Sequence, residues 1–271
     1  MNRIVHRRCP FCGQDNHAGA PTAYGNAVWP IKACAGCGFV YTEHAPVYER
    51  LMDEFAWEKT SHIESERRTA KHPIRQALSQ KMKGFRQKVL KRDKLPRLVR
   101  ERVTAGHVLD IGCGGGGVLS RLGPEYIPHG IEISRALAQR AAETLASRHG
   151  TVIHDAALHG LARFPPGYFS GVILSAFLEH EIEPKALLAG VLRVLAAGGC
   201  GIIKVPNYAS LNRVIHGSTW CGFRLPDHVN YFTPSSLARM CRQAGFEIDR
   251  FRLTDRHCFS DNLWIVIRKS A

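Results

Sequence analysis

Residues 108–119 read VLDIGCGGGGVL and place five glycines in six positions between two apolar stretches. Glycine weakens regular secondary structure, and it is useful where the backbone turns sharply or approaches a ligand closely. The apolar run His107–Ile111 predicts a strand before this turn, and Val118–Leu122 predicts a helix after it. We therefore expect a ligand to lie against the glycine turn.

From about residue 105 onward, strand-like and helix-like segments alternate along the chain. Further strands are expected at Ile127–Ile133, Val152–His154, Gly171–Ser175 and Gly201–Val205, and helices at Ser134–His149 and Pro184–Ala196. Such alternation predicts an α/β fold with a doubly wound, mostly parallel, Rossmann-like sheet. In these sheets ligands bind beyond the carboxyl ends of the strands, which is where the glycine turn lies.

Two kinds of cofactor compete for the glycine turn. Gly112, Gly114 and Gly117 satisfy the dinucleotide pattern G-x-G-x-x-G. Glu132 lies 20 residues after Gly112, where an acid would bind ribose hydroxyls. Asp110 discriminates between the cofactors, because a carboxylate directly before the turn repels the pyrophosphate of NAD. The same carboxylate suits a ligand with a cationic amino group and no phosphate, such as S-adenosylmethionine.

Asp110-Ile-Gly112-Cys-Gly114-Gly-Gly116 resembles the D/E-x-G-x-G-x-G first motif of class I S-adenosylmethionine-dependent methyltransferases. The resemblance covers about residues 105–271. It implies a seven-stranded methyltransferase sheet closed by antiparallel strands at Phe246–Leu253 and Leu263–Arg268. It also implies S-adenosyl-L-methionine as the cofactor and S-adenosyl-L-homocysteine as the product.

Further family motifs follow in the same order. Gly130-Ile-Glu132-Ile-Ser134 matches the acidic end of the second strand, and His154-Asp155-Ala156 stands where the family carries an acid beside adenine. Ser175-Ala-Phe-Leu-Glu179-His180 resembles the S-x-x-L-E-H stretch after the fourth strand. The cofactor-binding residues implied by the resemblance are Asp110, Gly112, Gly114, Gly116, Glu132, Asp155 and Ser175.

The later segment Leu225–Pro234 (LPDHVNYFTP) resembles a subgroup that also carries an N-terminal four-cysteine ribbon. This subgroup is similar to ubiquinone-type O-methyltransferases, which implies methyl transfer to a small or carrier-linked metabolite. His228 is the candidate catalytic base, or else a side chain that binds its own loop and shapes the pocket. His180 is the second catalytic candidate and is expected to line the pocket. Four nearby aromatic residues fit either core packing or a lid over an organic acceptor: Trp220, Phe223, Tyr231 and Phe232.

Two cysteine pairs near the N-terminus have the spacing of a metal site. Cys9-Pro-Phe-Cys12 and Cys34-Ala-Gly-Cys37 form two C-x-x-C pairs separated by 21 residues. Gly13 and Gly38 follow the second cysteine of each pair, where a tight turn needs a positive φ angle. Four thiolates fill the coordination shell of one zinc ion and leave no open position for water. We interpret residues 1–50 as a zinc ribbon with a structural ion held by Cys9, Cys12, Cys34 and Cys37.

The net charge of +14 is concentrated in one stretch. Between Arg67 and Arg102 the chain has 14 basic residues against two acidic ones. Residues 51–104 are interpreted as a basic helical connector, because apolar residues recur at helical spacing: Ile74, Leu78, Met82, Phe85 and Val89. Its basic face is either solvated or holds an anionic partner, which could be nucleic acid, a membrane surface or an anionic acceptor. The sequence carries no RNA-binding motif.

Three other functions stay open at this point. An RNA methyltransferase would use the ribbon and the basic connector to hold nucleic acid. A nicotinamide oxidoreductase would have to tolerate Asp110 beside a pyrophosphate, and a non-catalytic binding protein would keep the cofactor fold without turnover. No apolar run approaches the roughly 20 residues that span a bilayer. The basic N-terminus lacks the apolar core of a secretory signal, so a cytoplasmic location is expected.

Overall fold

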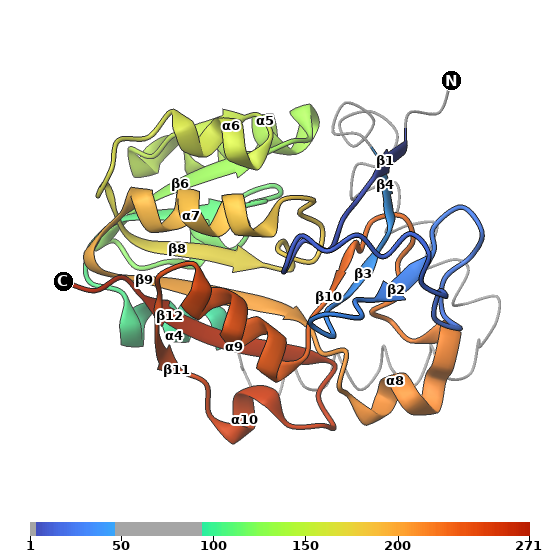
Figure 1. Ribbon diagram of the computed structural model, residues 1–271. Coiled ribbons are helices and arrows are strands. Elements are labelled where there is room, and N and C mark those ends of the chain that lie inside the picture. Colours follow the sequence, from blue (N-terminus) through green and yellow to red (C-terminus); the bar gives the residue numbers. More distant parts are fainter. Residues whose placement is uncertain (1–3, 47–93) are drawn as a thin grey trace, which may run out of the picture.

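The computed structural model describes residues 4–46 and 94–271. A seven-stranded sheet has the order β11-β12-β9-β8-β5-β6-β7 (Figure 1). Strands β5 to β9 pair in parallel, and β12 runs antiparallel between β9 and β11. The predicted doubly wound, mostly parallel α/β fold is confirmed. Its strands are β5 (Gly106–Ile111), β6 (Tyr126–Glu132), β7 (Val152–His154), β8 (Phe169–Ser175), β9 (Leu195–Pro206), β11 (Glu247–Arg250) and β12 (Asn262–Arg268).

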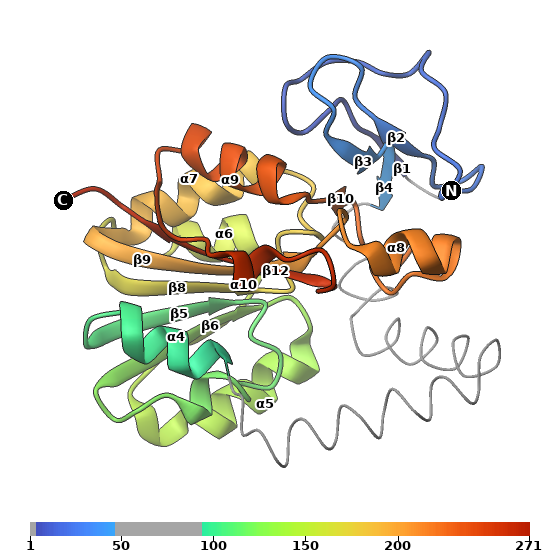
Figure 2. The ribbon, with the colours of Figure 1, turned by 90° about the horizontal axis from the view of Figure 1, so that it is seen from below.

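Helices cover both faces of the sheet, because the strands bury side chains on both sides. In β5, Leu109 and Ile111 belong to the core cluster of one face, and Val108 belongs to that of the other. Parallel sheets with covered faces have this pattern. Figure 2 shows α6 (Ala157–Ala162), α7 (Pro184–Val194) and α9 (Pro234–Gln243) on the first face, and α4 (Lys94–Arg102) and α5 (Arg135–Leu145) on the second.

Two helices near the carboxyl ends of the strands begin at capping residues. Ser134 caps α5 as predicted, with its hydroxyl accepting a hydrogen bond from the Leu137 backbone N–H at 3.4 Å. Thr233 caps α9 in a capping box with Ser236, and Pro234 occupies the first turn. These caps fix where each helix starts relative to the strand end before it.

The helix predicted directly after the glycine turn is shorter than expected. Only one 3-10 turn, Leu119–Arg121, follows the glycines. Gly123 and Pro124 follow after Leu122, and this pair interrupts helical structure. The prediction of a helix over Val118–Leu122 was therefore wrong in extent. As a result, the turn does not open a long helix whose N-terminus could attract a phosphate.

The N-terminal residues form a small ribbon that shares a sheet with the rest of the chain. Its strand β3 pairs with β2 on one side and with β10 (Asn230–Tyr231) on the other. Phe39 packs edge-on against Phe232, with ring centroids 5.4 Å apart. The segment Phe39–Tyr41 therefore packs the ribbon onto the main domain. The strands are β1 (Ile4–His6), β2 (Ile31–Ala33), β3 (Val40–Thr42) and β4 (His44–Pro46).

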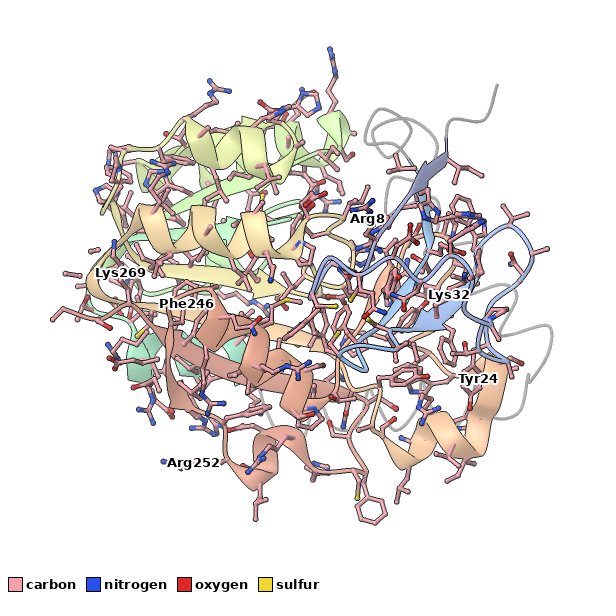
Figure 3. The ribbon with its side chains drawn as sticks, viewed as in Figure 1. Arg8, Tyr24, Lys32, Phe246, Arg252 and Lys269 are labelled. Atoms are coloured by element: carbon pink, nitrogen blue, oxygen red, sulfur yellow. The ribbon has the colours of Figure 1, made fainter. Side chains whose placement is uncertain are left out.

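The aromatic residues around His228 form packing between the ribbon and the sheet domain. Trp220 and Tyr231 are buried and share a hydrophobic cluster with Ile31 and Val40 of the ribbon. Tyr24 stacks on Phe223 at 4.7 Å and lies beside α8 (Leu211–His216) (Figure 3). Of the two interpretations left open by the sequence, core packing is the one found, and the aromatic lid was wrong.

The basic connector lies mostly outside the described residues, including its predicted helical positions Ile74, Leu78, Met82, Phe85 and Val89. Its last part, Lys94–Arg102, forms α4, which buries Leu95, Leu98 and Val99 against the sheet. Within residues 4–46 and 94–271, no helix is both long enough and apolar enough to cross a membrane.

Candidate cofactor and acceptor site

A cavity of about 380 Å³ opens at the carboxyl ends of the parallel strands. At one end the glycine turn and the ends of β6 and β7 form its wall, and at the other end the segment after β8 does. The predicted site residues that line it are Asp110, Gly112, Gly114, Glu132, Asp155, Ser175 and His180. Gly116 and His228 lie outside this lining.

The glycine turn needs glycine for backbone reasons at three positions. Gly112, Gly114 and Gly116 have φ angles of 75°, 54° and 79°, which side-chain-bearing residues rarely adopt. A Cβ atom on Gly112 would lie 2.5 Å from Cδ2 of Phe177, so this position also lacks space. At Gly114 nothing lies within 4 Å of such an atom, and this glycine faces the cavity.

Two carboxyl groups face the same part of the cavity. Asp110 at the end of β5 is 3% exposed, and its burial together with the charge of Glu132 raises its pKa well above the usual value. Glu132 at the end of β6 is held by backbone N–H groups that donate to its oxygens, from Gly114 at 2.8 Å and Ser134 at 2.9 Å. This arrangement favours a ligand that brings positive charge and hydroxyl groups.

The geometry around the turn does not fit a dinucleotide. In the dinucleotide pattern the third glycine allows close packing of a helix on the strand. A Cβ atom on Gly117 would meet nothing within 4 Å, and its φ angle is not positive. The turn leads into a 3-10 turn instead of a helix N-terminus, and Asp110 would face the pyrophosphate. These features argue against a nicotinamide cofactor.

Asp155 follows β7 and forms the far wall of this half of the cavity. Its Oδ1 accepts a hydrogen bond from the Ala156 backbone N–H at 2.8 Å. Ser175 ends β8, and Ala176 after it has a φ angle of 59°. A non-glycine residue in this conformation is strained, and such strain is often found where a protein holds a ligand. Both residues line the cavity.

The other half of the cavity is formed by polar residues after β8 and near β10. His180, Glu181, Lys204 and Asp227 line it. Nδ1 of His180 lies 3.0 Å from the Asp227 carbonyl oxygen, so Nδ1 carries the proton and donates it. Burial and the nearby Arg224 lower the pKa of His180 to about 4. The ring is therefore neutral near neutral pH, with Nε2 as a hydrogen-bond acceptor.

His228 lies behind His180, away from the cavity lining. The two rings meet edge-on with centroids 4.6 Å apart. Nδ1 of His228 donates to the Gly222 carbonyl oxygen at 2.8 Å, so the side chain also braces its own loop. Glu179 completes this cluster, and the ligand atoms of Glu179, His180 and His228 lie within 4.8 Å of one another.

Glu179 is a buried acid beside these histidines. Burial raises its pKa to about 8. Within the described part of the chain, its Oε2 has no hydrogen-bond partner. Both observations indicate a protonated carboxyl group at neutral pH.

Lys204 is a charged cavity residue that the sequence analysis missed. It lies in β9, where it pairs with Ser175 of β8. A signal was available, because Lys204 interrupts the otherwise apolar run Gly201–Val205. A lysine inside a buried strand is rare unless it has a partner or a function. Phe177, which covers Gly112, carried no comparable signal, since a phenylalanine after a strand is ordinary.

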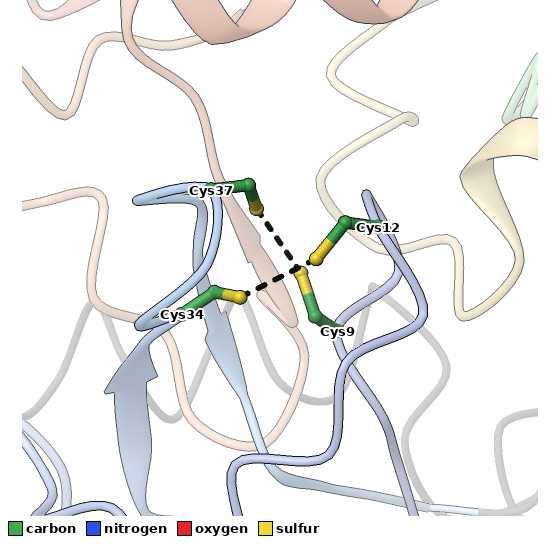
Figure 4. Close-up of side chains that lie close together, drawn as sticks. All are labelled: Cys9, Cys12, Cys34 and Cys37. Carbon is green, nitrogen blue, oxygen red and sulfur yellow. Dashed lines mark hydrogen bonds between the residues drawn. The ribbon is translucent and has the colours of Figure 1, made fainter.

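The four predicted zinc ligands converge in the ribbon (Figure 4). The sulfur–sulfur distance is 3.6 Å for Cys9 and Cys37 and 3.4 Å for Cys12 and Cys34. All four sulfurs lie within 4.8 Å of one another. Four sulfurs about 2.3 Å from a tetrahedral ion would lie about 3.8 Å apart, so the cluster fits zinc closely.

The backbone around the cysteines supports the same geometry. Gly13 and Gly38 have positive φ angles of 79° and 71°, as expected from their position after each cysteine pair. The Gly13 N–H donates to the Cys9 carbonyl oxygen and the Gly38 N–H to that of Cys34, each at 2.8 Å. The two cysteine turns are therefore near copies of one another, built to present two sulfurs each.

A second group of potential ligands in the ribbon has a different explanation. His6, Glu43 and His44 bring ligand atoms within 4.8 Å of one another. Glu43 is already paired with Lys32 at 2.9 Å, and Lys32 also donates to the carbonyl oxygens of Asn16 and His17. We interpret this group as a buried ion pair bordered by histidines.

Comparison with known protein families agrees with the fold. A family described as Methyltransferase domain matches residues 82–250, which is more than half of the chain. The chain belongs to this methyltransferase family. The expected class I methyltransferase fold is thus supported by the sheet topology and by the family match. The cysteine ribbon lies outside the matched range.

Curated relatives of this methyltransferase domain are named Ubiquinone biosynthesis O-methyltransferase. The relative from Aromatoleum aromaticum is 32% identical over 149 residues, covering 52% of this chain and 63% of the relative. The relative from Cupriavidus pinatubonensis is 30% identical over 157 residues, covering 54% and 61%. The chain thus covers less than two thirds of the length of these relatives.

Solved structures share the fold at low sequence identity. The cyclase SpnF is 20% identical with a TM-score of 0.53, covering 66% of this chain and 81% of that one. A SAM-dependent methyltransferase from Archaeoglobus fulgidus is 22% identical with a TM-score of 0.51, covering 68% and 98%. At these identities the likeness concerns the fold alone, and it includes a protein named for a different reaction.

Proposed function

We propose that this protein is an S-adenosylmethionine-dependent methyltransferase that methylates a hydroxyl oxygen of a small or carrier-linked metabolite. One observation carries the proposal. The positive-φ glycine turn and two carboxyl groups, Asp110 and Glu132, face the same cavity as His180. The names of the curated relatives support the choice of oxygen as the acceptor atom.

Each residue of the cofactor half has a role in this proposal. Asp110 and the turn Gly112–Gly116 receive the cationic methionine end, since Asp110 gains a partner for its charge. Glu132 binds ribose hydroxyls through lone pairs that its two backbone donors leave available. Asp155, after β7, is proposed to lie beside the adenine end, and Ser175, at the end of β8 on the other side of β5, is proposed to lie nearer the acceptor half. When bound, the cofactor supplies a methyl group on a positively charged sulfur.

His180 is the proposed acceptor-side catalytic residue. It lines the cavity, and its neutral Nε2 can accept the proton that leaves the acceptor hydroxyl. A positioned base contributes typically 10²–10⁴-fold, roughly, to such a reaction. His228 lies behind His180 and is proposed to hold its ring, and to act as base only if the loop that carries it moves toward the cavity. Lys204 would favour an acceptor with a negative charge.

The ribbon and the division of the chain complete the proposal. Residues 1–50 are proposed to bind one structural zinc ion, and residues 51–104 to form a connector that leads into the catalytic domain at 105–271. The ribbon contacts the catalytic domain through β10 and the aromatic cluster, which favours a bracing role over nucleic-acid binding.

Cofactor binding tests the proposal first. Isothermal titration calorimetry with S-adenosylhomocysteine and with NADH should show uptake of the S-adenosyl ligand only. Asp110→Asn should weaken binding at least about tenfold, because a charge-assisted contact is lost. Glu125→Gln is the matched control, since Glu125 is an exposed acid at the opposite end of the sheet. Binding of NADH, or no binding of the S-adenosyl ligand, would overturn the proposal.

The acceptor class is tested with labelled cofactor. Transfer of a tritiated methyl group to small hydroxylated compounds, and not to RNA, is the expected outcome. His180→Asn should lower the transfer rate about a hundredfold with unchanged cofactor affinity. Transfer to RNA would favour the RNA methyltransferase instead, and cofactor binding without transfer to any acceptor would favour a non-catalytic binding protein.

A further inference from the structure

The segments that form the acceptor half of the cavity are tied to the ribbon by one buried arginine. Arg7 lies two residues before Cys9, and it is 5% exposed. Its Nη1 donates to the carbonyl oxygens of Val229 at 2.9 Å and Thr42 at 3.2 Å. Its Nη2 donates to the Ile182 carbonyl oxygen at 3.0 Å and to Oδ1 of Asn230 at 2.9 Å. One guanidinium group thus joins three separate segments of the chain.

Two of these segments are bound to each other as well. The backbone N–H groups of Val229 and Asn230 both donate to the Glu179 carbonyl oxygen, at 2.8 and 3.0 Å. The Asn230 side chain donates from Nδ2 to the carbonyl oxygens of Leu178 at 3.1 Å and Glu181 at 2.6 Å. Residues 178–182 and 227–231 therefore form one hydrogen-bonded unit. This unit carries three of the residues that line the acceptor half: His180, Glu181 and Asp227.

The cofactor half is built differently. Asp110 and Glu132 lie at the carboxyl ends of β5 and β6, and Asp155 follows β7. These strands are neighbours in the order β5-β6-β7 at one edge of the seven-stranded sheet, whereas β10 pairs with β3 of the ribbon. Their positions are set by the ladder of the sheet and by α5. A change in the ribbon should therefore reach the acceptor half and leave the cofactor half in place.

We propose that Arg7 is a positioning residue through which the metal-bound ribbon holds the acceptor half of the cavity in shape. The inference rests on the proposed function, since it assigns this half of the cavity to the methyl acceptor. The cysteine turn that follows Arg7 fixes the backbone from which its side chain extends. Arginine suits the task because its planar fork offers five donors in a fixed geometry, whereas lysine offers three donors from a single atom.

Hydrogen–deuterium exchange measured by mass spectrometry on the full chain tests this coupling. In Arg7→Met, peptides covering residues 178–182 and 227–231 should exchange about tenfold faster or more, because buried acceptors lose a charged donor. Arg7→Lys should not restore protection, since one nitrogen cannot reach both segments. Peptides covering residues 110–116 and 130–134 should be unchanged. Arg8→Met is the matched control, because Arg8 is the exposed neighbour (Figure 3).

Metal removal and cofactor binding separate the outcomes. Chelation of the ribbon metal should accelerate exchange in the same two segments and leave S-adenosylhomocysteine affinity within about threefold. Asn230→Ala provides a second variant that loosens the unit from the opposite side, should Arg7→Met fail to fold. Acceleration confined to residues 4–46, rescue by Arg7→Lys, or a parallel loss of cofactor affinity would overturn the proposal. Failure of the wild type to bind the S-adenosyl ligand would instead overturn the proposed function and leave the coupling measurable.

Discussion

Replacing Gly112 by alanine tests the interpretation of the glycine turn directly. The φ angle of 75° costs a side-chain-bearing residue about 1–2 kcal/mol. The new Cβ would also lie 2.5 Å from Cδ2 of Phe177, where ordinary contacts exceed 3.4 Å. Displacing that ring in a packed site adds about 1–3 kcal/mol. The total penalty is therefore about 2–5 kcal/mol.

The penalty is divided between folding and binding. If the free protein keeps the turn, Gly112→Ala lowers the melting temperature by several degrees, at about 2–4 °C per kcal/mol for a chain of this size. If the turn relaxes in the free protein, the cofactor restores it on binding, and the affinity falls by roughly thirtyfold or more. Calorimetric titration and thermal unfolding of the same sample measure both parts.

Gly117→Ala is the control for this prediction. Its Cβ would meet nothing within 4 Å, and its backbone does not need a positive φ. We expect unchanged affinity and a stability change within about 1 kcal/mol, in the stabilising direction. Unchanged stability and affinity in Gly112→Ala, or a loss at Gly117 as large as at Gly112, would refute this account of the turn. A loss at Gly117 as large as at Gly112 would instead favour the dinucleotide pattern, in which Gly117 is the third glycine.

Three further predictions concern charge and metal. The raised pKa of Asp110 means that its carboxyl group in the free site binds a proton more readily than an exposed one, and a cationic ligand favours loss of that proton. Binding of S-adenosylmethionine should therefore release up to one proton and tighten as the pH rises, measurable by calorimetry in buffers of different ionisation enthalpy and absent in Asp110→Asn. The pKa of Glu179 is raised to about 8 in the folded protein, from about 4.5 in the unfolded chain. The contribution of this group to the free energy of unfolding is therefore complete below pH 4.5. It declines between that pH and about pH 8, at roughly 1.4 kcal/mol per pH unit. In denaturant titrations, the stability of Glu179→Gln relative to the wild type should therefore increase across this pH range. A difference between the two proteins that is the same at pH 5 and pH 8 would contradict the burial argument. Elemental analysis should find about one zinc ion per chain. Cys12→Ser should lose this zinc and have a lower melting temperature. A metal content unaffected by this substitution would exclude the cysteine site.

Features with a local cause were predictable from the sequence. The glycines at 112, 114 and 116 adopt positive φ angles because of their own backbone, and the paired cysteines converge because each pair forms one tight turn. Ser134 caps α5 through atoms three residues apart. The alternation of strands and helices likewise determined the sheet, since each strand buries both faces. In the glycine turn, in each cysteine turn and in the Ser134 cap, the interacting atoms are close together along the chain.

Features that depend on distant segments were decided only by the tertiary structure. The aromatic residues around His228 fitted a lid or a core equally well, and the ribbon packing against them settled the matter. The shortening of the helix after the turn is different, because its cause, Gly123 and Pro124, is local.

Arg7 and Lys204 illustrate why the sequence alone falls short. In the sequence, Arg7 is one basic residue in a basic N-terminus. In the structure it contacts Ile182 and Val229, which lie 175 and 222 positions further along the chain. Lys204 reaches the cavity because β9 lies beside β8 and brings it opposite Ser175. Whether a charged side chain is solvated or buried is determined by which distant segments surround it. The amino-acid sequence determines which functional groups Arg7 and Lys204 carry, and the fold determines which other residues those groups contact.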